Sequence, residues 1–232
     1  MRQLILFLSF ILLLPQSLNA MDEDDSQPAT SNINLVSAIT KFTNERWQES
    51  QTEFEYLLSK TPYDATVNFY LGRLSAKQKN FELAERYFVR AVEVEAENND
   101  YLVALADNYL QLAEQVSIFS KMSVTSKARD VLMRSHKLNP EHPDTLYALG
   151  HFFHSAPRLL GGDQDKAIAH LTKLTELSPD YVKAYDSLGY CFLEKAQPAD
   201  AIKAFNQALL IEPNLISAKQ GLKVAEQKLS QF

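Results

Sequence analysis

The feature that most limits how this chain can fold is a spacing of small residues that occurs twice. Gly72 is followed twelve residues later by Ala84, and Gly189 is followed at the same distance by Ala201. In both copies a leucine precedes the glycine, and a phenylalanine stands four residues after the alanine. The chain has six glycines, fewer than all-β folds and α/β nucleotide-binding folds of this length usually need, which favours a helical protein. Small residues at matching places would let two such helices approach closely.

The full pattern, Leu-Gly…Ala-x₃-Phe…Pro, resembles the 34-residue tetratricopeptide repeat. The resemblance covers about residues 34–214 and is most specific at 65–98 and 182–215. Prolines that end the second helix of a unit stand at Pro62, Pro140, Pro179 and Pro213. The resemblance implies a right-handed α-solenoid of about five helix pairs with a concave groove. The expected units are 34–64, 65–98, 99–142, 143–181 and 182–214, and a capping helix is expected at 215–232.

The third unit contains ten extra residues, because Ala106 and Ala128 stand 22 residues apart instead of twelve. This insertion, at about 113–126, either lengthens both helices of the unit or forms a protruding apolar loop. A protruding loop would be a candidate contact surface, with Phe119 and Met122 as contacts. Packing under neighbouring loops is the alternative.

The fourth unit contains five extra residues within SAPRLLGGDQDKA, at 155–167. No strand precedes the two glycines, and neither a dinucleotide fingerprint nor a phosphate loop is present. We expect Pro157 to end a helix, Gly161 and Gly162 to adopt positive φ, and Asp163 to cap the next helix. The insertion, at about 156–162, is similar to one in some exported bacterial tetratricopeptide proteins, including a family associated with periplasmic solute transporters. Further candidate contacts in this turn are Arg158, Leu159 and Leu160.

The first 20 residues have a basic start, an eleven-residue apolar run and a small residue at Ala20. This is typical of a secretory signal peptide, with an uncleaved anchor as the alternative. Residues 21–33 are acidic and then rich in Ser, Thr and Asn, so we expect a disordered linker. The formal net charge is −6 and no basic stripe is evident, which disfavours nucleic acid as a partner. We expect an exported protein, located in the periplasm of a Gram-negative bacterium and without stable membrane insertion after cleavage.

Residues on the first helix of each unit, three and four positions apart, are expected to line the groove. They combine aromatic side chains with both signs of charge, which suits a peptide segment or a flexible protein tail. Ordinary solvated helix positions are the alternative for each of them. The candidate partner-binding residues are Phe69, Arg73, Lys77, Asp107, Tyr147, His151, His154, Asp186, Tyr190 and Glu194.

Candidate sites for chemistry are few. The Lys and Asn pattern that clamps a carboxyl terminus in some tetratricopeptide grooves is not met, and the single cysteine, Cys191, is expected in the core. His151 and His154 share a helical face, but a metal site needs three or four ligands. We therefore predict no catalytic residues, metal or cofactor, and a periplasmic adaptor that binds a protein or peptide. The alternative is a small-ligand-binding accessory of an envelope transport system.

Overall fold

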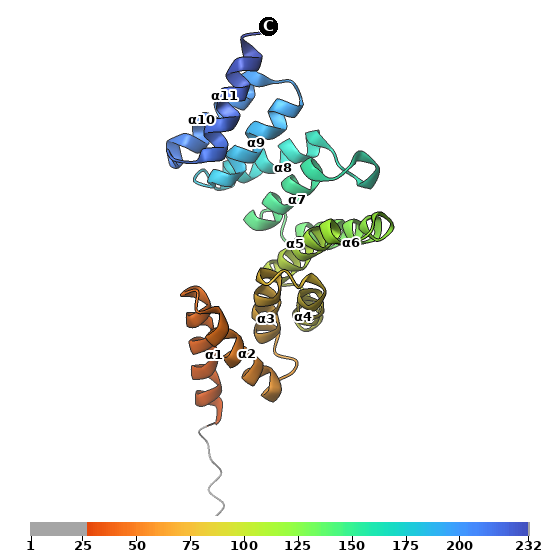
Figure 1. Ribbon diagram of the computed structural model, residues 1–232, viewed down its shortest axis with the longest axis vertical. Coiled ribbons are helices and arrows are strands. Elements are labelled where there is room, and N and C mark those ends of the chain that lie inside the picture. The colour runs from red at the N-terminus through yellow and green to blue at the C-terminus, as the bar shows by residue number, and fades with distance from the viewer. Residues whose placement is uncertain (1–26, 232) are drawn as a thin grey trace, which may run out of the picture.

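The computed structural model describes residues 27–231, and the predicted signal peptide and residues 21–26 lie outside this range. The described part contains eleven α-helices and no strand, which confirms the all-α repeat architecture. The helices stack in chain order along the long axis of the molecule (Figure 1). No helix in residues 27–231 combines the length and apolar character needed to cross a bilayer.

The first two helix pairs are α1 (Gln27–Thr43) with α2 (Trp47–Lys60) and α3 (Ala65–Lys77) with α4 (Phe81–Val94). They are followed by α5 (Asn99–Gln115) with α6 (Ile118–Leu138) and α7 (Pro143–Ser155) with α8 (Gln164–Leu177). The last pair is α9 (Val182–Glu194) with α10 (Pro198–Ile211), and α11 (Ile216–Leu229) packs on α10 and α9. Helix α1 begins at Gln27, inside the segment predicted as a linker, since Pro28 is tolerated in a first helical turn.

The glycines of the repeat pattern stand where the paired helices touch. A Cβ atom at Gly72 would lie 2.7 Å from the Phe88 ring, and one at Gly150 would lie 2.5 Å from Leu171. In the first unit the small residue at the helix contact is Ser50. It is fully buried and donates a hydrogen bond to the carbonyl of Ala38 at 2.9 Å. Close contact between the two helices of a pair is therefore what the repeated small residues provide.

The ten-residue insertion lengthens both helices of the third pair, the first of the two expected alternatives. Helix α5 has 17 residues and α6 has 21, against 13 and 14 in α3 and α4. Between Gln115 and Lys127 the sequence has neither proline nor glycine, so nothing in it ends the helices early. Only Val116 and Ser117 separate the two helices.

The five-residue insertion forms a turn with one 3₁₀ segment, η1 (Arg158–Leu160). Helix α7 ends at Ser155, two residues before Pro157, and Asp163 caps α8 by accepting hydrogen bonds from the backbone of Asp165 and Lys166. The expectation of positive φ at both glycines was wrong for Gly162, because only Gly161 adopts it, at +101°. Gly162 is needed for space, since a Cβ there would lie 1.8 Å from the carbonyl oxygen of Ala156.

Candidate functional site

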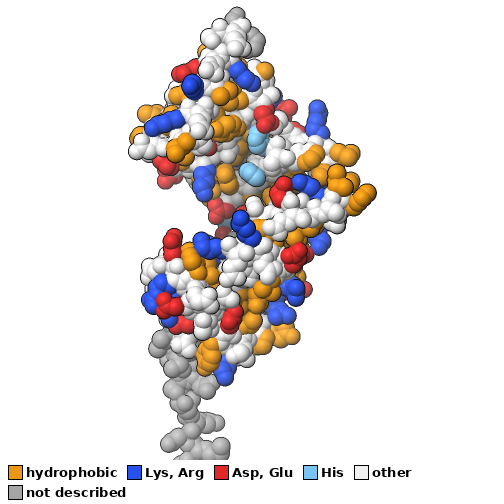
Figure 2. Space-filling view, in the orientation of Figure 1, with side chains coloured by type: hydrophobic (Ala, Val, Ile, Leu, Met, Phe, Trp, Pro, Cys, Tyr) orange, Lys and Arg blue, Asp and Glu red, His pale blue; other side chains and the backbone are white. Residues whose placement is uncertain are grey.

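A groove of about 650 Å³ runs across the first helices of four successive pairs, α3, α5, α7 and α9. Its walls combine aromatic rings with three acidic and two basic side chains. In Figure 2 the surface is hollowed at mid-height on the left, where red and blue side chains both gather. We call it the central groove; it is lined by Phe69, Tyr70, Arg73, Asp100, Val103, Ala104, Asp107, Asp144, Tyr147, Ala148, Tyr181 and Lys183.

Four of the predicted groove residues meet in the central groove: Phe69, Arg73, Asp107 and Tyr147. The Phe69 ring stacks on Tyr101, with centroids 4.7 Å apart, and is half-buried. The Arg73 guanidinium lies over the Phe42 ring, 4.5 Å from its centroid, and 5.6 Å from the centroid of Phe69. These contacts hold the cation against the aromatic wall at the α1 side of the groove.

The three carboxylates of the central groove differ in their partners. Asp100 lies 3.2 Å from Nε2 of His142, and Asp144 accepts a hydrogen bond from the Tyr181 hydroxyl at 3.2 Å. The Asp107 carboxylate has no hydrogen bond or ion pair among residues 34–231. Desolvation by the groove walls, with a smaller contribution from Asp144, raises the pKa of Asp107 to about 6.

A smaller cavity of about 230 Å³ adjoins the central groove and shares Arg73, Ala104 and Asp107 with it. We call it the side lobe. Asn108 lines it and is only 2% exposed. The Asn108 amide nitrogen donates to the carbonyl of Phe81 at 2.9 Å, and its Oδ1 has no partner among the described residues.

The other six predicted groove residues lie outside the central groove, and Lys77 and His151 are two of them. Lys77 stands at the end of α3, with its ammonium 4.1 Å from the centroid of the Trp47 ring. His151 lines a separate cavity of about 320 Å³ with Gln111 and Lys121. In α7 and α9 the central groove uses residues at the beginning of the helix, whereas His151 stands further along α7 and Lys77 is the last residue of α3.

Asp186 and Tyr190 contact the capping helix. The Asp186 carboxylate accepts a hydrogen bond from the Ser217 hydroxyl at 2.8 Å, and the Tyr190 hydroxyl donates to the Ser217 carbonyl at 2.9 Å. The Tyr190 ring also packs edge-on against Phe205, with centroids 5.1 Å apart. Both side chains thus tie α9 to α11, and neither lines the central groove.

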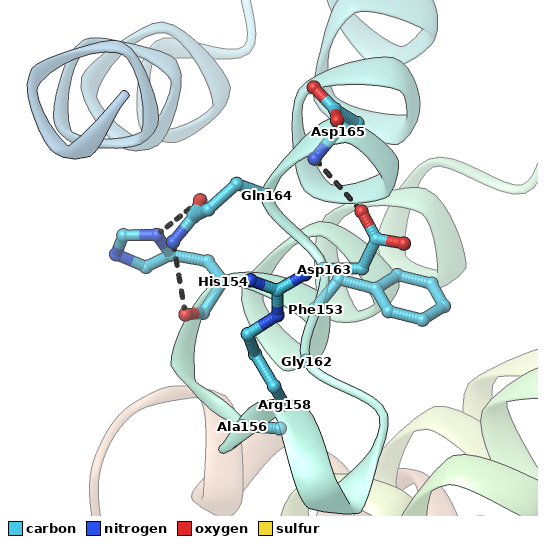
Figure 3. A pocket seen from close by; sticks show the side chains of 8 residues that line it. All are labelled: Phe153, His154, Ala156, Arg158, Gly162, Asp163, Gln164 and Asp165. Atoms are coloured by element: carbon cyan, nitrogen blue, oxygen red, sulfur yellow. Dashed lines mark hydrogen bonds between the residues drawn. The ribbon is translucent and has the colours of Figure 1, made fainter. Parts of the chain in front are cut away.

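His154 belongs to the insertion turn. Figure 3 shows its ring beside Gln164, in a pocket of about 340 Å³ that Arg158 and Asp163 also line. Its Nδ1 lies 3.2 Å from Gln164 Oε1, 3.4 Å from Cys191 Sγ and 3.6 Å from Glu194 Oε2. His151 and His154 therefore line different cavities and do not face one site.

Cys191 is fully buried, as expected of a core residue. Burial, with a smaller contribution from Glu194, raises the pKa of its thiol to about 12. The nucleophilic thiolate is therefore a minor form near neutral pH, although the His154 imidazole lies close. The arrangement provides packing and a weak hydrogen bond.

The candidate contacts of the two insertions are solvent-exposed. Phe119 is 88% exposed and Met122 48% exposed on the first turns of α6, and Leu159 is 86% exposed on η1. Arg158 is also exposed, whereas Leu160 is half-buried. These side chains form a surface separate from the central groove.

Sequence reasoning missed several lining residues, of which Asp144, Tyr181 and Lys183 carry polar groups into the groove. The signal was present, because Asp144 stands three residues before Tyr147 on the same helical face. In α7 and α9 the positions predicted to line the groove began too late along the helix.

A family model described as tetratricopeptide repeat matches residues 35–101 and 161–214, together more than half of the chain. The chain belongs to the tetratricopeptide repeat family. The unmatched stretch between the two segments contains the first insertion and most of the second, which interrupt the period. Such repeats generally form non-catalytic scaffolds for protein interaction.

Two curated relatives from Schizosaccharomyces pombe match most of the chain. Superkiller protein 3 is 25% identical over 80% of this chain, and anaphase-promoting complex subunit 3 is 24% identical over 71% of it. The matches span only 13% and 23% of those proteins, respectively.

Similar solved structures include a thermophilic tetratricopeptide repeat protein of Thermus thermophilus. It is 20% identical, has a TM-score of 0.69, and the match covers 85% of this chain and 99% of that one. YrrB, described as having an unusual peptide-binding site, is 18% identical with a TM-score of 0.59, covering 82% and 90% of the two chains. MamA is 22% identical with a TM-score of 0.58, covering 80% and 93%. At these identities the likeness shows the fold.

Proposed function

We propose that this protein is a non-enzymatic adaptor whose central groove binds an extended segment of a partner protein. The observation that carries the proposal is one groove of about 650 Å³ built by the first helices of four successive pairs. Aromatic side chains such as Phe69 and Tyr147 supply contact area, and the charged groups between them fix the register of a bound chain. A peptide-binding site described for the structurally similar YrrB is compatible with this use of the fold.

The N-terminal pattern supports the proposal that binding takes place after export. The basic start, apolar run and small residue at Ala20 are the features that a signal peptidase recognises. We expect the mature chain to begin at Met21 in the periplasmic fraction. N-terminal sequencing of the fractionated protein checks this, and an uncleaved chain in the membrane fraction would contradict it.

The binding proposal is tested by crosslinking in intact cells, followed by recovery of the tagged full chain. Tyr147→Ala removes an aromatic wall of the groove and should reduce partner recovery about tenfold. Tyr63→Ala is the matched control, because Tyr63 is exposed and lies outside the groove. Equal recovery by the folded groove variant and its control would refute the proposal.

A second candidate function is supported by the pocket at the insertion turn. This pocket, of about 340 Å³, is lined by polar side chains including His154, Arg158 and Gln164, and its size suits a small ligand (Figure 3). Native mass spectrometry of the full chain purified from its host would detect a retained ligand. Retention that Arg158→Ala abolishes would favour an accessory role in transport.

A further inference from the structure

We propose that the central groove recognises a cationic side chain in the bound segment, and that an arginine fits best. The inference rests on the proposed function, because it names the chemistry of the segment that the groove would hold. Its centre is Asp107, the residue shared by the central groove and the side lobe.

The first argument is the unpaired charge of Asp107. The Asp107 carboxylate is exposed at the groove surface, and no described residue gives it a hydrogen bond or an ion pair. It is therefore free to accept a charged hydrogen bond from an incoming segment. Asp100 and Asp144 add negative potential on the same wall. The groove's own cation on this side, Arg73, is held over the Phe42 ring and makes no ion pair with Asp107. An incoming cation would compensate the carboxylates.

The second argument comes from Asn108 in the side lobe. Its Oδ1 is buried and unpartnered, although its amide nitrogen is used by Phe81. A buried acceptor without a donor is uncommon and costs stability. Asp107 lines both cavities and Asn108 lines the side lobe, so carboxylate and amide acceptors stand on neighbouring residues where the two cavities adjoin. A guanidinium carries five donors in a fixed planar fork, which is the best complement to several acceptors at one place.

The third argument is the aromatic wall. Phe69 and Tyr147 line the same groove as Asp107, from the helices before and after it. Guanidinium planes stack on aromatic faces more readily than ammonium groups do. An acidic side chain would instead meet three carboxylates against two cations, Lys183 and Arg73, and Arg73 is held over the Phe42 ring. The groove therefore favours arginine over lysine, and both over glutamate or aspartate.

Selection from a random peptide library displayed on phage tests the inference without knowledge of the natural partner. The full chain and its Asp107→Asn variant are immobilised, and Asp180→Asn is the matched control, since Asp180 is exposed and lies outside the groove. We expect peptides recovered on the wild type and the control to be enriched in arginine at one position. The enrichment should disappear on Asp107→Asn.

Binding of a recovered peptide is then measured by fluorescence anisotropy. Replacing its enriched arginine by glutamine should weaken binding about tenfold or more to the wild type and under threefold to Asp107→Asn. Selection of acidic or uncharged peptides that Tyr147→Ala still abolishes would overturn the cation preference and leave groove binding intact. Peptides that bind equally to the wild type, Asp107→Asn and Tyr147→Ala would overturn both proposals.

Discussion

The packing of Phe205 predicts that alanine substitutions at two helical glycines destabilise the protein. The Phe205 ring is fully buried on α10, between Gly189 of α9 and Gly221 of α11. A Cβ atom would lie 2.4 Å from the ring at Gly189 and 2.3 Å from it at Gly221. Carbon atoms in favourable contact are about 3.5–4.0 Å apart, so the ring would have to move by more than an ångström. Tyr190, packed edge-on against the same ring, limits that movement.

The magnitude follows from two opposing effects. Replacing glycine by alanine inside a helix ordinarily stabilises it by about 1 kcal/mol. Overpacking a well-filled core costs about 1–3 kcal/mol. We therefore expect Gly189→Ala and Gly221→Ala each to lower the free energy of unfolding by roughly 0–2 kcal/mol, toward the upper end because both overlaps exceed an ångström.

Urea unfolding of the full chain, followed by circular dichroism, measures the effect. Asn206→Ala, at an exposed position of α10, is the control for helix propensity and should change stability little. Leucine at position 205 leaves more room, so combining Phe205→Leu with Gly189→Ala should reveal a favourable coupling of about 1 kcal/mol. If both glycine variants are more stable than the wild type, the ring is not confined as described and the reasoning fails.

Three further predictions follow from other contacts. The rings of His170 and His136 lie 5.2 Å apart, and burial lowers the pKa of His170 to about 4. Between that pH and the ordinary histidine pKa, His170 is therefore protonated in the unfolded chain and neutral in the folded one. Stability should therefore fall by roughly 2 kcal/mol from pH 6.5 to pH 4 through this residue, and His170→Gln, measured by urea unfolding at several pH values, should reduce that slope. Asp163→Ala removes the cap of α8 and should cost about 1 kcal/mol in thermal unfolding, whereas Asp165→Ala, which leaves the cap in place, should cost less. Gly162→Ala should rearrange the insertion turn and increase amide exchange at residues 156–163, because its Cβ would collide with backbone; unchanged exchange would contradict this.

The sequence predicted the helix pairs well because the residues that join them are local and periodic. Gly72 and Ala84 occupy the contact between α3 and α4, and each proline after a second helix stands two residues beyond its end. The structure of the two insertions was harder to predict, because the repeat spacing gives the length of an insertion but not its conformation. Composition decides it: the first lacks proline and glycine and continues the helices, whereas the second contains Pro157 and Gly161 and forms a turn.

The residues of the groove were only partly predictable. Helical periodicity shows which residues share one face of a helix, but it does not show which other helix packs against that face. Phe69 and Tyr147 were found by their spacing, and the structure places both in the central groove. Asp186 and Tyr190 occupy equivalent faces of α9, yet the capping helix meets them through Ser217. The position of α11 depends on how it packs around Phe205, a tertiary property that no local pattern contains.

The two irregular units place exposed side chains away from the central groove. The central groove is lined from the early turns of α7 and α9 and from Asp100 to Asp107 in α5. The first insertion extends the far end of α5 and the start of α6, and the second forms the turn after α7; Phe119 and Leu159 are exposed there. Changes in the insertions can therefore alter one edge of the solenoid without changing the groove. A partner that uses both surfaces would lose part of its affinity with Phe119→Ser and a different part with Asp107→Asn, and the two losses should add because the sites share no contacts.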